Sequence, residues 1–152
     1  MCISIILVKK RPFVVSSLKK KREDGMKMKI TSFNPLIATA NYDSIVKLFE
    51  ELGFKGRHTK EGIEVEDRDN TVLRMKDENG FYLDVVQDNS FSRDITGIRI
   101  NVDDFDEAYN LFISHGFEQF GEAGTISTSS SKFVLLKSPS GFVVNLVQHI
   151  AK

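Results

Sequence analysis

Four polar side chains interrupt apolar stretches of this sequence and could bind an anionic or amide-bearing molecule. They are Asp84, Arg99, Asn101 and Asn145. Each lies in a segment that alternates like a β-strand, so residues two apart share a face. A metal-free reaction could use Asp84 as general base and Arg99 to stabilise negative charge, but we expect binding rather than catalysis. The simpler interpretation is that Arg99 pairs with Asp84 or reaches solvent.

The histidines and the cysteine offer no alternative chemistry. His58, His115 and His149 are spaced unlike a set of metal ligands. Because Cys2 is the only cysteine, an intrachain disulfide is excluded and nothing indicates an oxidising compartment. We therefore expect a cytoplasmic protein.

An internal repeat predicts the elements that position these side chains. The string Leu48–Phe54 resembles Leu111–Phe117, and Asn79–Gln87 resembles Ser140–Gln148, both about 60 residues further along the chain. Two matches in the same order indicate a tandem duplication of residues 28–150.

Each half predicts the element order β-α-β-β-β. Helices are expected after Asn41 and after Asp103 or Asp104, with Gly53 and Gly116 as left-handed C-caps. The first helix has an apolar stripe at Ile45, Leu48, Phe49 and Leu52, and the second at Phe105, Ala108, Leu111 and Phe112. The expected strands are Ile30–Thr39, Phe54–Thr59, Thr71–Lys76, Phe81–Gln87, Ile95–Val102, Phe117–Phe120, Lys132–Lys137 and Phe142–Gln148.

These residues resemble the vicinal oxygen chelate superfamily, which includes glyoxalase I, extradiol dioxygenases and bleomycin-resistance proteins. The resemblance rests on Val102–Asp106, on Leu111–Phe117 and on the hairpin Ser138–Gln148. It implies an α+β fold of two tandem βαβββ modules around a cleft of mixed β-sheet. The expected domain covers 28–152, with modules of about 28–90 and 91–150.

The resemblance also locates the family's metal-binding positions. They fall on Asn34, Asp84, Gly97 and Asn145. One carboxylate, two amides and a glycine make a poor donor set for zinc or iron, so we expect neither a metal nor another cofactor.

Strand alternation indicates which side chains share the cleft with these positions. The predicted ligand-binding residues are Asn34, Tyr82, Asp84, Arg99, Asn101 and Asn145. The face that Arg74 occupies stays open, because the Lys76–Phe81 turn fits either parity. Gly121–Ser131 is expected to be a flexible loop near the cleft mouth.

Three functions remain compatible with this pattern. The first is a metal-independent protein that binds a small organic molecule, as in the bleomycin-resistance branch. The second is a metal-dependent lyase, isomerase or dioxygenase with an atypical ligand set. The third is an interaction module without a ligand. Because members of this family frequently pair their sheets between subunits, the resemblance also implies a homodimer.

Composition narrows the partners further. The 152 residues are 41% hydrophobic and 28% charged, and no apolar run approaches the roughly 20 residues that cross a bilayer. Residues 1–29 carry nine Lys/Arg and two acidic residues, whereas 30–152 carry twelve and nineteen. An acidic body argues against binding to nucleic acid.

The basic segment 1–27 has three interpretations. It is a solvated, disordered extension, which we favour; a polyanion-binding arm; or a segment that is not normally translated, with Met26 or Met28 as the start.

Overall fold

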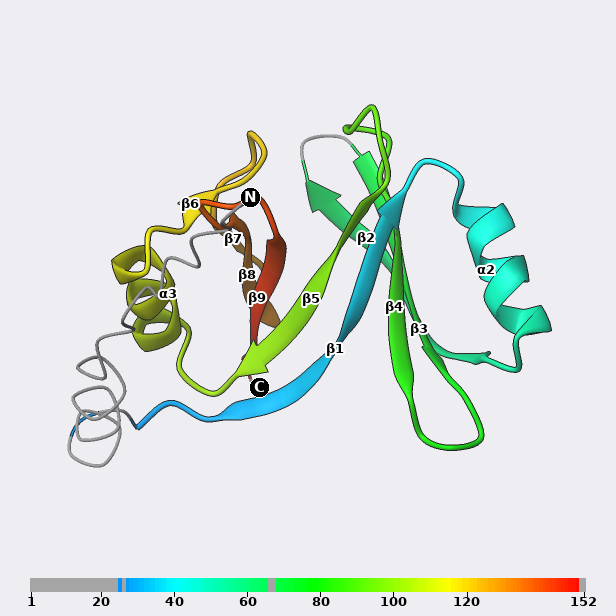
Figure 1. Ribbon diagram of the computed structural model, residues 1–152, viewed down its shortest axis with the longest axis horizontal. Coiled ribbons are helices and arrows are strands. Elements are labelled where there is room, and N and C mark those ends of the chain that lie inside the picture. The colour runs from blue at the N-terminus through cyan, green and yellow to red at the C-terminus, as the bar shows by residue number, and fades with distance from the viewer. Residues whose placement is uncertain (1–24, 26, 66–67, 151–152) are drawn as a thin grey trace, which may run out of the picture.

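The computed structural model describes Gly25 and residues 27–65 and 68–150 (Figure 1). The first unit contains β1 (Ile30–Thr39), α2 (Tyr42–Glu51), β2 (Lys55–Val65), β3 (Arg68–Lys76) and β4 (Tyr82–Gln87). The second contains β5 (Ile95–Val102), α3 (Phe105–Ser114), β6 (Glu118–Gln119), β7 (Ile126–Ser127), β8 (Ser131–Lys137) and β9 (Val143–His149). The α+β architecture of two βαβββ modules is confirmed, with β7 as a short addition. The expected extension 1–27 lies outside the described residues, except for Gly25 and Lys27.

One mixed sheet joins the two modules. Its strand order is β2-β3-β4-β1-β5-β9-β8-β6, with β7 on β8. The first strand of each module pairs in parallel with the last one, β1 with β4 and β5 with β9, and β1 pairs antiparallel with β5 at the centre. In Figure 1 the two helices lie at opposite ends of the molecule, outside the sheet. No helix of the described residues is long and apolar enough to span a membrane.

Each helix packs on one face of its own module, which we call the outer face of the sheet. Val144 and Leu146 of β9 form one core with Phe105 and Ala108 of α3. Leu83 and Val85 of β4 form the other core, against which residues of α2 pack. The residues between them on each strand therefore point to the opposite face, which we call the inner face.

The helix termini follow the predictions only in part. Gly53 and Gly116 adopt positive φ angles of 99° and 83° after the helices, as predicted. Asp104 caps α3 by accepting a hydrogen bond from the Glu107 backbone N–H at 2.9 Å. Asn41 occupies the N-cap of α2, but its side chain makes no capping bond, so the predicted cap is wrong there.

Four other expectations differ from the structure. The β2/β3 hairpin extends well beyond the predicted Phe54–Thr59 and Thr71–Lys76, because backbone pairing continues through residues without an apolar pattern. Phe117–Phe120 forms only the two-residue β6, and the predicted loop Gly121–Ser131 contains β7, paired with β8. Of the α2 stripe, Leu48 and Leu52 remain 49% and 63% exposed.

Candidate functional site: a cationic cluster on the inner face of the sheet

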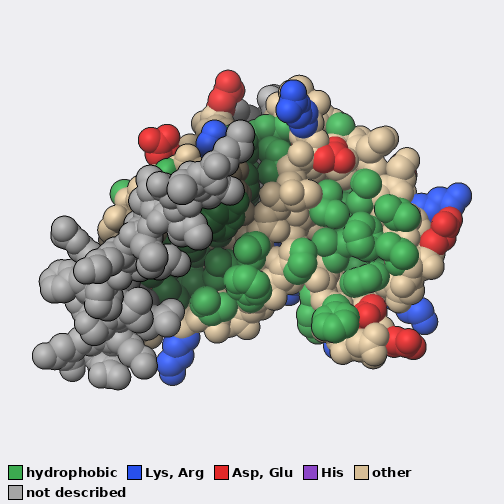
Figure 2. All heavy atoms as spheres, viewed as in Figure 1, with side chains coloured by type: hydrophobic (Ala, Val, Ile, Leu, Met, Phe, Trp, Pro, Cys, Tyr) green, Lys and Arg blue, Asp and Glu red, His purple; other side chains and the backbone are tan. Residues whose placement is uncertain are grey.

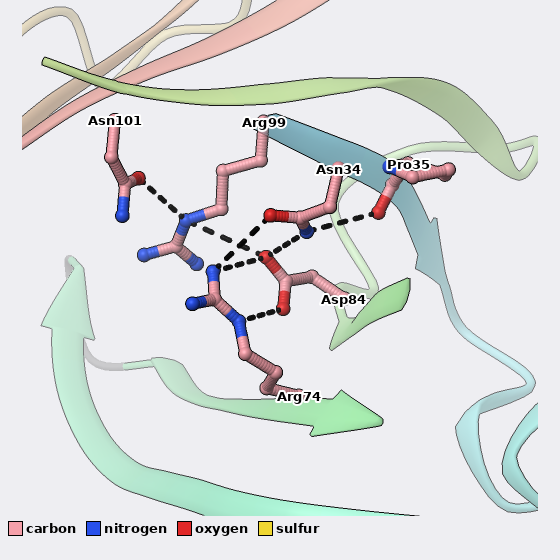
Figure 3. A network of polar contacts seen from close by, with 6 residues as sticks. All are labelled: Asn34, Pro35, Arg74, Asp84, Arg99 and Asn101. Atoms are coloured by element: carbon pink, nitrogen blue, oxygen red, sulfur yellow. Dashed lines mark hydrogen bonds and ion pairs between the residues drawn. The ribbon is translucent and has the colours of Figure 1, made fainter. Parts of the chain in front are cut away.

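A polar network centred on Asp84 lies on the inner face (Figure 3). Arg74 donates from Nε to Asp84 Oδ1 at 2.9 Å and from Nη2 to Oδ2 at 3.0 Å. Asn34 Nδ2 donates to the same Oδ2 at 2.6 Å. Arg99 Nε lies 3.6 Å from Oδ2 and donates to Asn101 Oδ1 at 3.3 Å.

Strand register brings these groups together. Arg74 is the direct partner of Asp84 across β3 and β4, and Asn34 is the partner of Arg99 across β1 and β5. Arg99 is also paired with Asn145 across β5 and β9. Direct cross-strand partners project to the same face, so β1, β3, β4, β5 and β9 all contribute to one site.

The cluster is buried and carries a net positive charge. The Asp84 side chain is fully buried, whereas the side chains of Arg99 and Arg74 are 12% and 29% exposed. The hydrogen bond to Asp84 raises the pKa of the Arg74 guanidinium, and burial lowers the pKa of the Arg99 guanidinium against the attraction of Asp84. Because arginine stays protonated in proteins, two cations face one anion within the described part of the cluster.

Donors of both arginines remain for a ligand. Within the described part of the chain, the terminal nitrogens of Arg99 and one of Arg74 make no hydrogen bond. In Figure 3 this nitrogen of Arg74 and one terminal nitrogen of Arg99 point to the same side, away from Asp84, and the other terminal nitrogen of Arg99 points toward Arg74. The buried Ser32 Oγ and Asn145 Oδ1 likewise have no partner among the described residues. A buried polar atom without a partner is costly, so both oxygens suit contact with a bound molecule.

The two modules contribute unlike halves to the inner face. Leu135 pairs with Asn145 as Arg74 pairs with Asp84, so an apolar side chain replaces the guanidinium in the second module. Phe133 of β8 pairs with the buried Val147 of β9 on the same face. The first module therefore supplies charge and the second supplies apolar surface.

The predicted site residues do not all join the network. Asn34, Asp84, Arg99 and Asn101 do, while Asn145 adjoins Arg99 through strand pairing. Tyr82 lies at the margin of the network and is 41% exposed. The centre of its ring is 5.8 Å from Arg74 Cζ and 5.0 Å from Lys76 Nζ.

Arg74 is the member that the sequence left unplaced. Its neighbours Leu73 and Met75 belong to the outer-face core, which turns Arg74 inward. These two flanking apolar residues are the signal that could have placed it.

The network argues against Asp84 as a general base. Both of its oxygens accept hydrogen bonds from Arg74, and Oδ2 also accepts one from Asn34. Both carboxylate oxygens are thus already engaged by protein donors, which leaves little room for a ligand atom to reach them.

A metal does not fit the positions that the resemblance assigns to it. Asn34 and Asp84 already bind each other and Arg74. At Gly97 an added Cβ atom would lie 2.4 Å from the Val143 backbone oxygen, so no side-chain ligand can be built there. Among the described residues, no three His, Cys, Asp or Glu side chains gather in a way that could hold a metal ion.

Solved structures share this arrangement of strands and helices. Methylmalonyl-CoA epimerase from Mycobacterium tuberculosis is similar with a TM-score of 0.57 and 15% identity, over 80% of this chain and 90% of that one. A glyoxalase/bleomycin resistance protein/dioxygenase superfamily member from Vibrio splendidus 12B01 gives 0.51 and 15%, over 79% and 99%. The chain has the vicinal oxygen chelate fold. No family model matches the chain, and no curated protein matches its sequence.

A further solved structure that is similar to this chain contains bound ligands. It is a methylmalonyl-CoA epimerase in complex with methylmalonyl-CoA and NH4+, with a TM-score of 0.55 and 18% identity, over 81% of this chain and 97% of that one. At such identities the likeness establishes the fold, and the chemistry of this chain has to be argued from its own residues.

Proposed function

We propose that this protein binds a small organic carboxylate on the inner face of its sheet, without a metal. The observation that carries the proposal is the buried Arg74–Asp84–Arg99 cluster. Among the described residues its net charge is positive, and one guanidinium nitrogen of each arginine that has no partner there points to the same side. Guanidinium groups bind carboxylates through paired, charge-assisted hydrogen bonds. Phe133 and Leu135, which are half-buried on the same face, would receive the apolar body of the ligand.

Matched pairs of acids and amides test the charge requirement. Benzoate and 3-phenylpropionate should bind in calorimetry and raise the melting temperature, whereas benzamide and 3-phenylpropionamide should not. Inorganic phosphate should bind more weakly than the aromatic acids, because it has no apolar body. Equal binding of acids and amides, or tighter binding of phosphate, would contradict the proposal.

Arg99→Met tests the residue that presents the free donors. It should weaken binding of 3-phenylpropionate at least tenfold, since a charged bidentate contact contributes more than about 1.4 kcal/mol. Arg93→Met is the matched control, because Arg93 is exposed. Unchanged affinity in the Arg99 variant would remove the arginine from the site.

The alternative is a metal-dependent lyase, isomerase or dioxygenase. It predicts tightly bound metal in purified protein and loss of function after chelation. We expect the carboxylate affinity and the melting temperature to be unchanged by EDTA and by added zinc, iron or manganese. Stoichiometric metal in purified protein would favour the alternative.

We also propose that two copies of the chain associate through an apolar groove on the outer face. The groove has a volume of about 640 Å³, and its lining includes Tyr82 but no residue whose side chain takes part in the hydrogen-bonded Asp84 network. Phe33 and Phe81 line it and are 61% and 66% exposed. Figure 2 shows hydrophobic side chains gathered over β4 and α2. Exposed apolar patches of this kind commonly mark protein interfaces.

Light scattering after gel filtration tests the homodimer. The wild type should have the mass of two chains, and Phe33→Glu combined with Phe81→Glu should have the mass of one. Ile113→Glu, on α3 and 40% exposed, is the control and should leave the mass unchanged. A monomeric wild type would refute this assembly.

A further inference from the structure

We infer that the Arg74 guanidinium stands where this fold would hold a divalent metal, and that it keeps such an ion out. Two of the four positions that correspond to metal ligands, Asn34 and Asp84, both contact this one side chain. Arg74 Nη2 lies 3.0 Å from Asp84 Oδ2 and 3.4 Å from Asn34 Oδ1. Two ligand-type oxygens thus converge on a nitrogen that carries positive charge (Figure 3).

The positive charge of the cluster also opposes binding of the ion, in addition to the space that Arg74 occupies. Arg74 and Arg99 together outnumber Asp84, so the cluster is already positive before any metal approaches. A divalent ion would meet two cations in a buried region, where like charges repel more strongly than in water. It would also have to displace the paired hydrogen bonds of Arg74 to Asp84.

The second module cannot make up for this loss. It offers Gly97, Leu135 and Asn145 at the positions equivalent to Asn34, Arg74 and Asp84. Gly97 has no room for a side chain, and leucine has no ligand atom. Asn145 Oδ1 has no hydrogen-bond partner among the described residues, but a single amide oxygen is a weak metal ligand. The identity of residue 74 therefore decides whether this position holds a guanidinium group or can bind a metal ion.

Substituting residue 74 should convert one into the other. Residues 74 and 84 are direct partners on neighbouring antiparallel strands, so a histidine at 74 would project beside the Asp84 carboxylate. Arg74→His combines an imidazole, a carboxylate and the Asn34 amide, which is the number of protein donors that a catalytic metal site uses. Asp84 keeps Arg99 as a counter-ion in this variant.

The experiment titrates the full-length protein with Co2+ and follows the visible absorption spectrum and the melting temperature. Arg74→His should bind one Co2+ per chain at least about 100-fold more tightly than wild type and melt at a higher temperature with Co2+ than with EDTA. Arg74→Lys, which keeps the positive charge, should behave like wild type. Arg74→His combined with Asp84→Asn should lose the gain.

A second, more conservative variant distinguishes a failure to fold from a failure to bind metal. Arg74→Gln retains an N–H donor for Asp84, so it should fold, and it should bind Co2+ more tightly than wild type but less tightly than Arg74→His. If Arg74→His folds only when Co2+ is present, that dependence supports the inference. Stoichiometric Co2+ in wild type, or folded Arg74→His and Arg74→Gln with no gain over wild type, would overturn it.

The outcome is distinguishable from that of the proposed carboxylate binding. Wild type can fail to bind any aromatic acid and still exclude Co2+. It can also bind an aromatic acid and bind Co2+ as well, and the two titrations measure these results separately. The role inferred for Arg74 concerns the cation, whereas the proposed function concerns the anion.

Discussion

Substituting Asp84 by asparagine measures what the buried cluster contributes to stability. The amide keeps the shape of the side chain but removes the one negative charge that is paired with Arg74 and Arg99 among the described residues. Breaking a buried ion pair from one side costs about 3–5 kcal/mol. Arg74 is 29% exposed, so water compensates part of its loss, whereas Arg99 is only 12% exposed. We therefore expect a loss of about 2–4 kcal/mol in the free energy of unfolding.

The assay is urea denaturation monitored by circular dichroism. An m-value equal to that of wild type would show that the same unfolding transition is being compared. For a chain of this size the loss corresponds to a fall of about 4–16 °C in melting temperature. Asp106→Asn is the matched control: this carboxylate lies 2.6 Å from Lys132 Nζ but is 78% exposed. Such a surface pair contributes less than about 1 kcal/mol. If Asp84→Asn costs no more than Asp106→Asn, the cluster is screened by solvent and our account of it is wrong.

Three substitutions and one truncation test the framework around the site. Gly97→Ala should cost about 3 kcal/mol in urea denaturation, because its Cβ would meet the Val143 backbone oxygen at 2.4 Å; a loss below about 1 kcal/mol would show that the strands can separate there. Asp104→Ala should cost about 1 kcal/mol by removing a helix cap, and Asn41→Ala should be nearly neutral; equal effects would contradict the difference between the two helix starts. A chain beginning at Met28 should unfold cooperatively with a free energy within about 1 kcal/mol of the full chain, and failure to fold would show that the removed segment is structural.

The architecture and part of the site could be predicted from the sequence because both depend on local spacing. The repeated helix endings predicted Gly53 and Gly116 as left-handed caps, and both have positive φ. The two-residue period of a strand predicted that Arg99 and Asn101 share a face, and a hydrogen bond joins them. An internal sequence repeat and the alternation of polar and apolar residues can both be recognised in the sequence without knowledge of the fold.

Only the tertiary structure decided how these groups interact. The face of Arg74 depends on the register between β3 and β4, which turn parity alone left open, and that register makes Arg74 the direct partner of Asp84. Asp84 consequently lies in a buried ion pair with two arginines, where its sequence suggested a cleft carboxylate available to a ligand. Pairing across strands far apart in the chain determines both results, because it sets the distances between charges that no local pattern records.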